Sequence, residues 1–191
     1  MTTLLTRLRA RPIPSVIAIV ALVLALGFGV IAAVLTWLPE DSAANSGDSE
    51  ELVNTAGGYR IEVPESWSST QEGRTTTVKS PDGNTLITFG LGRTGPLAVA
   101  ATLFFQQVGS NYDKVEVFKP EAETIGGLPA LVYAGVGNND KNVRVRFLTI
   151  TVENSPTNYG ITVFTELGSD PQAVLPQVNE VVESFRELPP A

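Results

Sequence analysis

The stretch LPALVYAGVGNNDKNVRVRFLTITVENSPTNYGITVFTE, residues 128–166, decides the fold of this chain. Three runs rich in β-branched and aromatic residues, LPALVYAGVG, NVRVRFLTITV and NYGITVFTE, are separated by NNDK and ENSPT, which are polar loops of hairpin length. Strands joined by such short loops have to be antiparallel. In the middle run Leu148, Ile150 and Val152 lie on the face opposite to Phe147, so we expect its second half to be covered on both faces.

More strand patterns precede this stretch. YRIEV, residues 59–63, alternates apolar and polar residues and stops at Pro64. RTTTVKS (74–80) and TLITFGL (85–91) flank the turn PDGN and predict a hairpin. KVEVF (114–118) predicts a further strand. The sequence therefore predicts a sheet that is mainly antiparallel.

Two helices are predicted to flank this sheet. The first follows Pro96, a good first-turn residue, and its helically spaced apolar residues are Leu97, Ala101, Phe104, Phe105 and Val108. The second lies in SDPQAVLPQVNEVVESF (169–185), with a stripe of Val178, Val181, Val182 and Phe185. Pro176 within this segment predicts either a kink or a late helix start. The expected fold class is α+β, an antiparallel β-sheet flanked by helices.

A glycine pattern between the hairpin and the first helix resembles a dinucleotide-binding fingerprint. Gly90, Gly92 and Gly95 form G-x-G-x-x-G, and an acid follows at Asp113 or Glu116. That fingerprint belongs to a parallel sheet with helices between its strands, whereas the strand before Gly90 belongs to a hairpin. We therefore expect no cofactor, and we interpret these glycines as the end of a strand and the start of a helix.

The N-terminal region predicts a membrane anchor. Residues 15–38 are uncharged and would form a helix about 36 Å long, enough for a hydrocarbon core of about 30 Å. Arg7, Arg9 and Arg11 lie in the tail of residues 1–14, and acids follow the span, so the positive-inside rule places the N-terminus in the cytoplasm. We expect a single-pass protein of the cytoplasmic membrane with its C-terminal domain outside. The alternative is a signal peptide cleaved near Ala44.

Small residues recur every four positions within the expected span, at Ala21, Ala25, Gly29 and Ala33. Such a stripe lets two membrane helices approach closely and would support a weak helix–helix dimer. The alternative interpretation is the ordinary abundance of alanine and glycine in membrane helices.

Residues 39–58 predict a flexible acidic spacer, because small and acidic residues leave too little apolar surface for folding. An acidic docking peptide is the functional alternative. Residues 59–191 are expected to form the extracytoplasmic domain.

Composition excludes several classes of function. The chain has no cysteine and no histidine, which removes the usual zinc, haem and iron–sulfur ligands and the Cys-His and Ser-His nucleophile pairs. All 20 acidic residues but only ten of the 13 basic residues lie beyond residue 38, so the exported part has a formal charge of −10. This charge disfavours nucleic acid as a partner.

The remaining polar clusters predict little chemistry. Asp82 and Asp140 lie in turns that lack calcium-loop spacing, so at most they would bind a cation loosely. Glu121 and Glu123 are expected in a solvated loop after Pro120, where nothing would separate their pKa values for acid–base catalysis.

Several segments resemble PsbP/Mog-like domains, including the bacterial LpqN-type envelope proteins. These segments are YRIEVPESW (59–67), the hairpin around SPDGNTLITF, TIGGLPALVYAG (124–135), the strands that follow it and VVESFRE (181–187). The resemblance covers roughly residues 59–187 and implies an antiparallel sheet flanked by helices, in an α/β sandwich that docks onto other proteins and has no shared catalytic centre. The lipid-modified cysteine of the lipoprotein members is absent here.

These observations together favour a non-enzymatic binding or accessory module that acts through protein–protein interaction in the bacterial envelope. Carriage of an apolar envelope ligand such as a lipid is the alternative, and an uncharacterised enzyme is the minor one. We assign no binding residue, and we expect Trp67 and Phe185 to belong to the core rather than to a groove.

Overall fold

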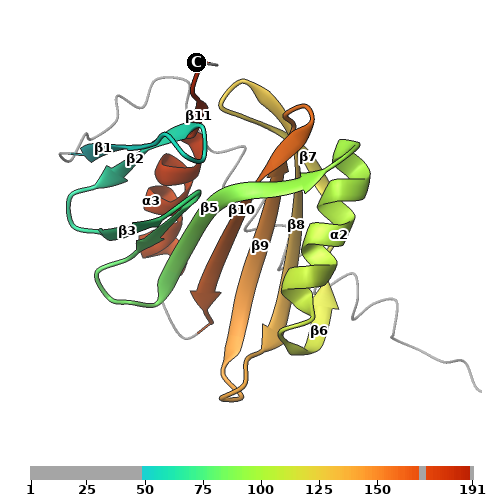
Figure 1. Ribbon diagram of the computed structural model, residues 1–191. Helices are drawn as coiled ribbons and strands as arrows, with labels where there is room; N and C mark the ends of the chain where they lie inside the picture. Colours follow the sequence, from blue (N-terminus) through green and yellow to red (C-terminus); the bar gives the residue numbers. More distant parts are fainter. Residues whose placement is uncertain (1–48, 168–170, 190–191) are drawn as a thin grey trace, which may run out of the picture. The chain divides into compact units, whose positions relative to one another are not determined.

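Two antiparallel sheets form the framework of the part that this computed structural model describes, residues 49–167 and 171–189 (Figure 1). The larger sheet has the strand order β3-β4-β5-β10-β9-β8-β6, with β7 also paired to β8, and the smaller sheet has the order β1-β2-β11. The strands are β1 Ser49–Asn54, β2 Tyr59–Pro64, β3 Ser68–Glu72, β4 Thr75–Lys79, β5 Thr85–Thr94, β6 Asp113–Val117, β7 Glu121–Ile125, β8 Leu128–Asn138, β9 Arg144–Val152, β10 Thr157–Glu166 and β11 Arg186–Glu187. The antiparallel pairing predicted for β8, β9 and β10 is confirmed.

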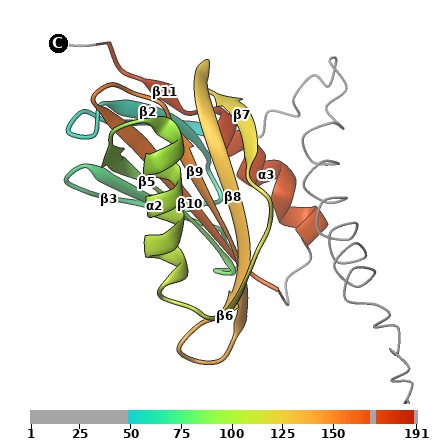
Figure 2. The ribbon, with the colours of Figure 1, turned by 90° about the vertical axis from the view of Figure 1, so that its right-hand side faces the viewer.

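Two helices lie on opposite sides of the larger sheet (Figure 2). α2 (Leu97–Gly109) begins directly after Pro96, whose fixed φ suits a helix start. α3 (Pro171–Glu183) contains Pro176 in its interior, so the helix neither begins late nor ends at this residue. An α+β fold with an antiparallel sheet flanked by helices is therefore confirmed.

The main core lies on the α3 side of the larger sheet and is rich in aromatic rings. Tyr59, Phe89, Tyr159 and Phe185 are each at most 3% exposed, and the ring centroids of Tyr159 and Phe185 are 5.0 Å apart. Trp67 is also buried, and its Nε1 donates a hydrogen bond to Gln177 on α3 at 3.1 Å. Trp67 and Phe185 thus belong to the core, as expected.

The second half of β9 is covered on both faces, as its sequence predicts. Residues 149–152 are all buried. Ile150 and Val152 pack in the core on the α3 side, while Thr149 and Thr151 lie on the opposite face.

The spacer expected over residues 39–58 is wrong for its last ten residues. Ser49–Asn54 forms β1, which pairs with β2 along its whole length, and Gly57 and Gly58 belong to the turn between the two strands. Asn54 is buried and donates to the Thr76 hydroxyl at 3.1 Å. The composition of this segment does not predict the strand. The contacts that stabilise β1 come from β2 and β4 rather than from apolar residues of β1 itself.

Glu121 and Glu123 lie in a strand, β7, and not in the solvated loop that the sequence predicts. Both side chains are half-buried. Desolvation, together with the negative charges of Glu121 and Glu183, raises the pKa of Glu123 above its usual range. The strand was missed because its alternation of acidic and small residues carries no apolar signal.

The predicted tail, membrane span and small-residue stripe, all within residues 1–38, and the first part of the spacer lie outside the described residues. Among residues 49–167 and 171–189, no helix has the length and apolar character needed to cross a membrane.

Candidate functional site

A row of hydroxyl-bearing side chains crosses the face of the larger sheet that carries α2. Strand register places one such residue on each of six adjacent strands, from β3 to β8. They are Thr70, Thr77, Thr88, Thr162, Thr149 and Tyr133. One pleat further along the same face, Gly90 of β5 pairs with Gly160 of β10.

α2 covers only one half of this face. Phe105 stacks on Tyr133 and Phe147 with ring centroids 5.3 and 5.6 Å apart, and Thr149 beneath the helix is 1% exposed. Neither of the two described helices lies above the other half, over β4 and β5, and within the described residues Thr77 and Thr88 are partly exposed there. The sheet face is therefore open beside α2.

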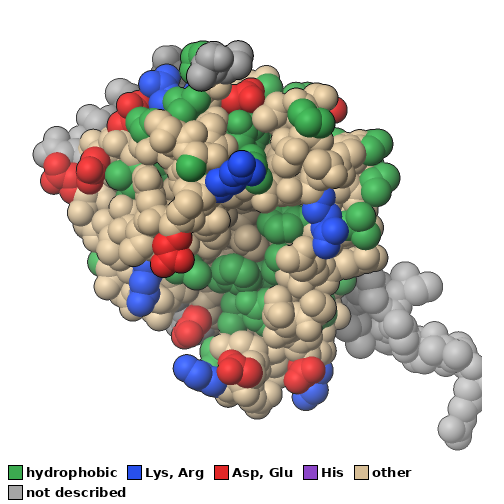
Figure 3. Space-filling model, in the orientation of Figure 1, with side chains coloured by type: hydrophobic (Ala, Val, Ile, Leu, Met, Phe, Trp, Pro, Cys, Tyr) green, Lys and Arg blue, Asp and Glu red, His purple; other side chains and the backbone are tan. Residues whose placement is uncertain are grey.

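Small residues make this open half concave. The pair Gly90 and Gly160 adds no side chain to the face, and Phe104 of α2 lies over Gly160, with its ring 3.0 Å from the position that a Cβ there would take. Figure 3 shows the surface hollowed at this place, between α2 and the β3–β4 side of the sheet. We call this depression the glycine hollow; Gly90 and Thr88 form its accessible floor, and their cross-strand partners Gly160 and Thr162 are buried beside them.

A β-bulge directs Arg93 toward this hollow. The register of β5 and β10 shifts between the pairs Leu91↔Tyr159 and Thr94↔Thr157. Asn158 of β10 therefore lies opposite two residues of β5, Gly92 and Arg93. Asn158 is 1% exposed, and its Nδ2 donates to the carbonyl oxygens of Arg93 at 2.8 Å and of Gly95 at 3.0 Å. The buried amide thereby holds the bulged backbone in place.

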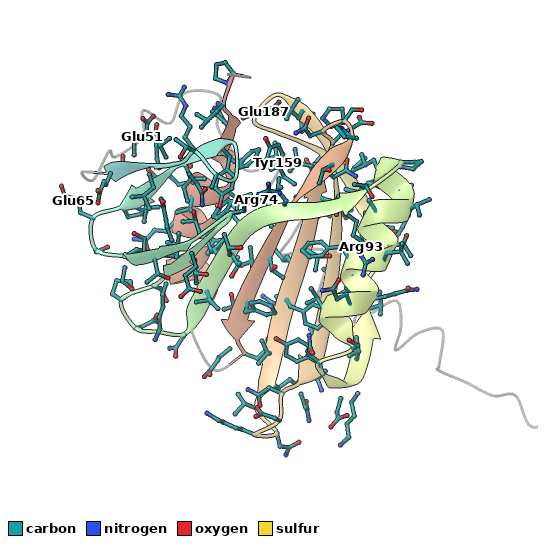
Figure 4. All side chains as sticks on the ribbon, viewed as in Figure 1. Glu51, Glu65, Arg74, Arg93, Tyr159 and Glu187 are labelled. Carbon is teal, nitrogen blue, oxygen red and sulfur yellow. The ribbon has the colours of Figure 1, made fainter. Side chains whose placement is uncertain are left out.

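The Arg93 guanidinium is oriented by the helix. Its NH2 donates to Oε1 of Gln107, on α2, at 2.8 Å. A second arginine, Arg74, follows the β3–β4 turn, and its carbonyl oxygen lies 3.7 Å from the position of a Cβ on Gly90. Figure 4 shows Arg74 and Arg93 on two sides of the hollow.

Within the described residues, neither guanidinium forms an ion pair with an acid. The ion pairs formed among the described residues are Arg60–Glu51 and Arg144–Glu116, at 3.0 and 2.8 Å, and both are remote from the hollow in register. The rim of the glycine hollow therefore has a local positive potential within a domain that is acidic overall.

The solvent-facing side of α2 is a second unusual surface. The thirteen residues of this helix, LAVAATLFFQQVG, include no charged side chain. Val99 is 55% exposed and Leu103, one turn later, is 42% exposed. We call Ala98, Val99, Leu103 and Gln106 the outer face of α2; hydrophobic side chains are visible along this helix in Figure 3.

The glycine pattern of the sequence has a structural explanation at this site. Gly90 and Gly92 lie within β5, and Gly95, with φ +111°, precedes Pro96. A Cβ on Gly92 would approach the Asn158 carbonyl oxygen to 3.1 Å, so a side chain at this position would be tight against the β10 backbone at the bulge. β5 pairs antiparallel with β4 and β10, so the parallel unit to which the dinucleotide fingerprint belongs is not formed.

The other sequence candidates do not converge on the hollow. The Asp82 carboxylate accepts hydrogen bonds from the Ser80 hydroxyl at 2.5 Å and from the Asn84 backbone at 3.1 Å, and these bonds lower the pKa of Asp82. Asp140 is exposed in the β8–β9 turn. Across the two described ranges, no group of three acidic side chains is arranged to hold a metal ion.

Sequence reasoning missed both arginines of the rim. The only signal for Arg93 was its place inside the glycine pattern, since a glycine-flanked arginine near a strand end is compatible with a bulge. Arg74 follows Gly73, which has a positive φ of 57°, and nothing local distinguishes it from any other turn residue.

Known folds provide an independent comparison. No protein-family model and no curated protein sequence matches the chain. Among solved structures, cyanobacterial PsbP from Synechocystis sp. PCC 6803 is similar with a TM-score of 0.55 and 14% identity, over 78% of this chain and 98% of that one. The Ran-binding protein Mog1p of Saccharomyces cerevisiae is similar with a TM-score of 0.55 and 14% identity, over 75% and 97%.

LpqN of Mycobacterium tuberculosis, a protein involved in cell envelope biogenesis, is similar with a TM-score of 0.52 and 16% identity, over 80% of this chain and all of that one. At such low identity the likeness establishes the fold and not a shared activity. The similarity extends over nearly the whole length of three separate domains, and it agrees with the landmarks between Tyr59 and Glu187. The described part of the chain therefore has the fold of PsbP/Mog-like domains.

Proposed function

We propose that this chain is a membrane-anchored, extracytoplasmic binding module that acts through contact with another protein of the bacterial envelope and catalyses no reaction. The observation that carries the proposal is the outer face of α2, where Val99 and Leu103 are exposed on a helix without a single charge. Depletion of charge together with exposed apolar side chains characterises the centre of a protein interface.

Three further observations support the proposal. Solved structures of this fold include a Ran-binding protein and a protein involved in cell envelope biogenesis, so the fold is used for docking elsewhere. The apolar run of residues 15–38, preceded by three arginines, supports an anchored domain outside the cytoplasmic membrane. The lack of cysteine and histidine in the whole chain supports a non-catalytic role.

Site-specific photocrosslinking tests the contact. A photoreactive amino acid at Leu103 of the full chain, in cells that produce the native protein, should yield one adduct of defined mass. The same residue at Glu180, on the exposed side of α3, serves as the matched control and should yield none. Equal adducts from both positions, or none from Leu103, would show that the outer face of α2 does not bind a protein.

Reporter fusions test the location separately. Alkaline phosphatase fused after Ala191 should be active, because the enzyme functions only outside the cytoplasm. An active cytoplasmic reporter at this position would place the domain inside, and recovery of a soluble fragment beginning near Asn45 would show that the span is a cleaved signal peptide.

A further inference from the structure

We propose that the glycine hollow binds an extended acidic segment of the protein partner, with Arg93 and Arg74 each receiving a carboxylate. This inference rests on the proposed function, because its ligand is part of a protein. It adds a second contact, distinct from the outer face of α2, and it specifies the chemistry of the partner.

The position of Arg93 favours binding of a carboxylate. The bulge and the buried Asn158 amide fix its backbone, and a neutral hydrogen bond to Gln107 orients its exposed side chain. Gln107 satisfies one of the five N–H groups of the guanidinium, which leaves a planar fork for a carboxylate. An arginine held in this way loses less conformational freedom on binding than a mobile surface arginine does.

The two arginines are spaced to suit one extended peptide. The Arg74 backbone lies beside Gly90, and Arg93 follows three residues later on β5, so the two backbones are about 10 Å apart at the strand rise per residue. On an extended peptide, side chains two residues apart share one face at a separation of about 7 Å, and the flexible side chains of Arg74 and of the peptide's glutamates span the difference. One extended segment can therefore present two carboxylates to the two arginines at once.

The floor between the two arginines suits a peptide backbone, which needs close approach and polar partners. Partly exposed Gly90 allows the close approach, and the partly exposed residue Thr88 provides a hydroxyl. Next to this polar floor, Leu86 and Phe164 are cross-strand partners on the same face and both are partly exposed. They offer an apolar contact for one side chain of the segment.

Charge distinguishes the ligand class. Nucleic acid would bring many phosphates against a domain that carries far more acids than bases, and two separated arginines would neutralise few of them. A short acidic segment needs only these two contacts. The observations therefore favour a carboxylate-bearing peptide over an oligonucleotide.

Fluorescence anisotropy of labelled octaglutamate, with the full-length protein in detergent micelles, tests the inference. Octaglutamate should bind saturably and more weakly as salt is raised, whereas octaglutamine and a single-stranded oligonucleotide of eight residues should not bind. R74Q/R93Q should lower the affinity at least tenfold. K119Q/K141Q, which removes the same charge from two exposed lysines elsewhere, should change it less than twofold.

A second variant fills the hollow without changing charge. A Cβ on Gly90 would make ordinary contacts, 3.4 Å to the Thr75 hydroxyl and 3.7 Å to the Arg74 carbonyl oxygen, and Gly90 has no positive φ. G90V should therefore fold with an unchanged thermal midpoint, yet lower octaglutamate affinity at least tenfold because its side chain occupies the floor.

Three results would overturn the inference: no preference for octaglutamate over octaglutamine, equal loss of affinity in the two double variants, or unchanged affinity in G90V. Preferential binding of the oligonucleotide would assign the hollow to phosphate instead. A Leu103 adduct that persists in R74Q/R93Q, combined with any of these results, would leave the proposed function intact and reject only the acidic segment. If the chain with unmodified arginines yields no Leu103 adduct but binds octaglutamate in the hollow, only the proposed function is rejected.

Discussion

At the scale of single residues, buried polar side chains fix the backbone where the two sheets meet. Tyr59 is fully buried, and its hydroxyl donates to the Thr76 hydroxyl at 2.9 Å or the Phe89 carbonyl oxygen at 3.1 Å, while Asn54 approaches it at 3.4 Å. One phenol thereby links β1, β4 and β5. Asn158 has the corresponding role on the other side of β5, where it holds the bulge. Such groups specify one arrangement of strands because a buried polar atom left without a partner is costly.

Replacing Tyr59 with Phe removes this hydroxyl without changing the ring. We expect Y59F to lower the free energy of unfolding by about 1–2 kcal/mol, because buried partners on three strands lose a hydrogen bond. Urea denaturation measures this change. Y112F is the matched control, since no hydrogen bond involves the Tyr112 hydroxyl among the described residues, and it should cost less than about 0.5 kcal/mol. Equal effects in the two variants would contradict this account of the network.

Glu123 predicts a pH effect with a definite sign. Desolvation and the carboxylates of Glu121 and Glu183 raise its pKa in the folded state, so the folded protein binds this proton more tightly than the unfolded chain does. Stability therefore falls as pH rises from the unfolded pKa through the raised folded pKa. E123Q should stabilise the protein at neutral pH by up to about 0.5 kcal/mol, or a rise of about 1–2 °C in thermal midpoint.

That advantage should vanish in acid below the unfolded pKa of Glu123, where the wild-type carboxyl is protonated in both states. Thermal melts of both proteins across this pH range test the prediction. E72Q on exposed β3 is the control and should show no comparable gain. A gain from E123Q that is independent of pH would show that charge is not its cause.

At the scale of elements, the segment from β5 to α2 positions both candidate surfaces. β5 contributes the glycine floor and the bulge, and α2, which starts directly after Gly95 and Pro96, covers half of the face and presents its uncharged side outward.

β1 illustrates the opposite case, in which an element depends on its neighbours. Its residues carry little apolar surface, and its edge position is stable because β2 pairs with it and Leu52 packs against the core.

Removal of β1 should therefore destabilise the domain. A fragment that begins at residue 55 lacks Leu52 and the Asn54 amide, and it exposes the edge of β2. Compared with a fragment that begins at Ser49, its free energy of unfolding should fall by about 3–5 kcal/mol, the range of changes that break a buried network. Urea denaturation of the two fragments measures the difference. Equal stability would mean that β1 is a dispensable strand and that the domain begins near Tyr59.

At the scale of the whole molecule, the core combines the smaller sheet, α3 and one face of the larger sheet. About 140 residues bury enough surface for an independent fold, and no cysteine or histidine is present to provide a disulfide or a zinc site. Stability must therefore come from packing and hydrogen bonding. A second, smaller aromatic cluster under α2 contains Phe105 and Phe147, and near it the buried hydroxyls of Thr149 and Thr151 have no hydrogen-bond partner among the described residues.

The domain of residues 49–191 should unfold cooperatively as a monomer, with a thermal midpoint that millimolar nicotinamide or flavin dinucleotide does not raise. A ligand present at 100 times its dissociation constant would add about 2.7 kcal/mol, which calorimetry detects readily. We expect this result because β5 pairs antiparallel with both of its neighbours, so the parallel β-α-β unit that aims a helix N-terminus at a pyrophosphate is not formed. A saturable rise that G90V abolishes would assign a cofactor to the glycine turn.

The strands and helices that local periodicity and short loops encode could be predicted from the sequence. Alternating residues and hairpin-length loops predicted β8, β9 and β10 and their antiparallel order, and helical spacing after Pro96 predicted α2. The same topology argument excluded a dinucleotide fold at Gly90. These inferences succeed because each depends on residues that are near one another in the chain.

The other features depend on contacts between distant parts of the chain. β1, β3 and β7 have polar or acidic sequences, and each becomes a strand because a neighbouring strand satisfies its backbone hydrogen bonds. The hollow required Gly90 and Gly160, 70 positions apart, to become cross-strand partners, and its rim required a bulge held by Asn158. Long-range register places these residues together, and no local pattern records which distant strand will supply the neighbour.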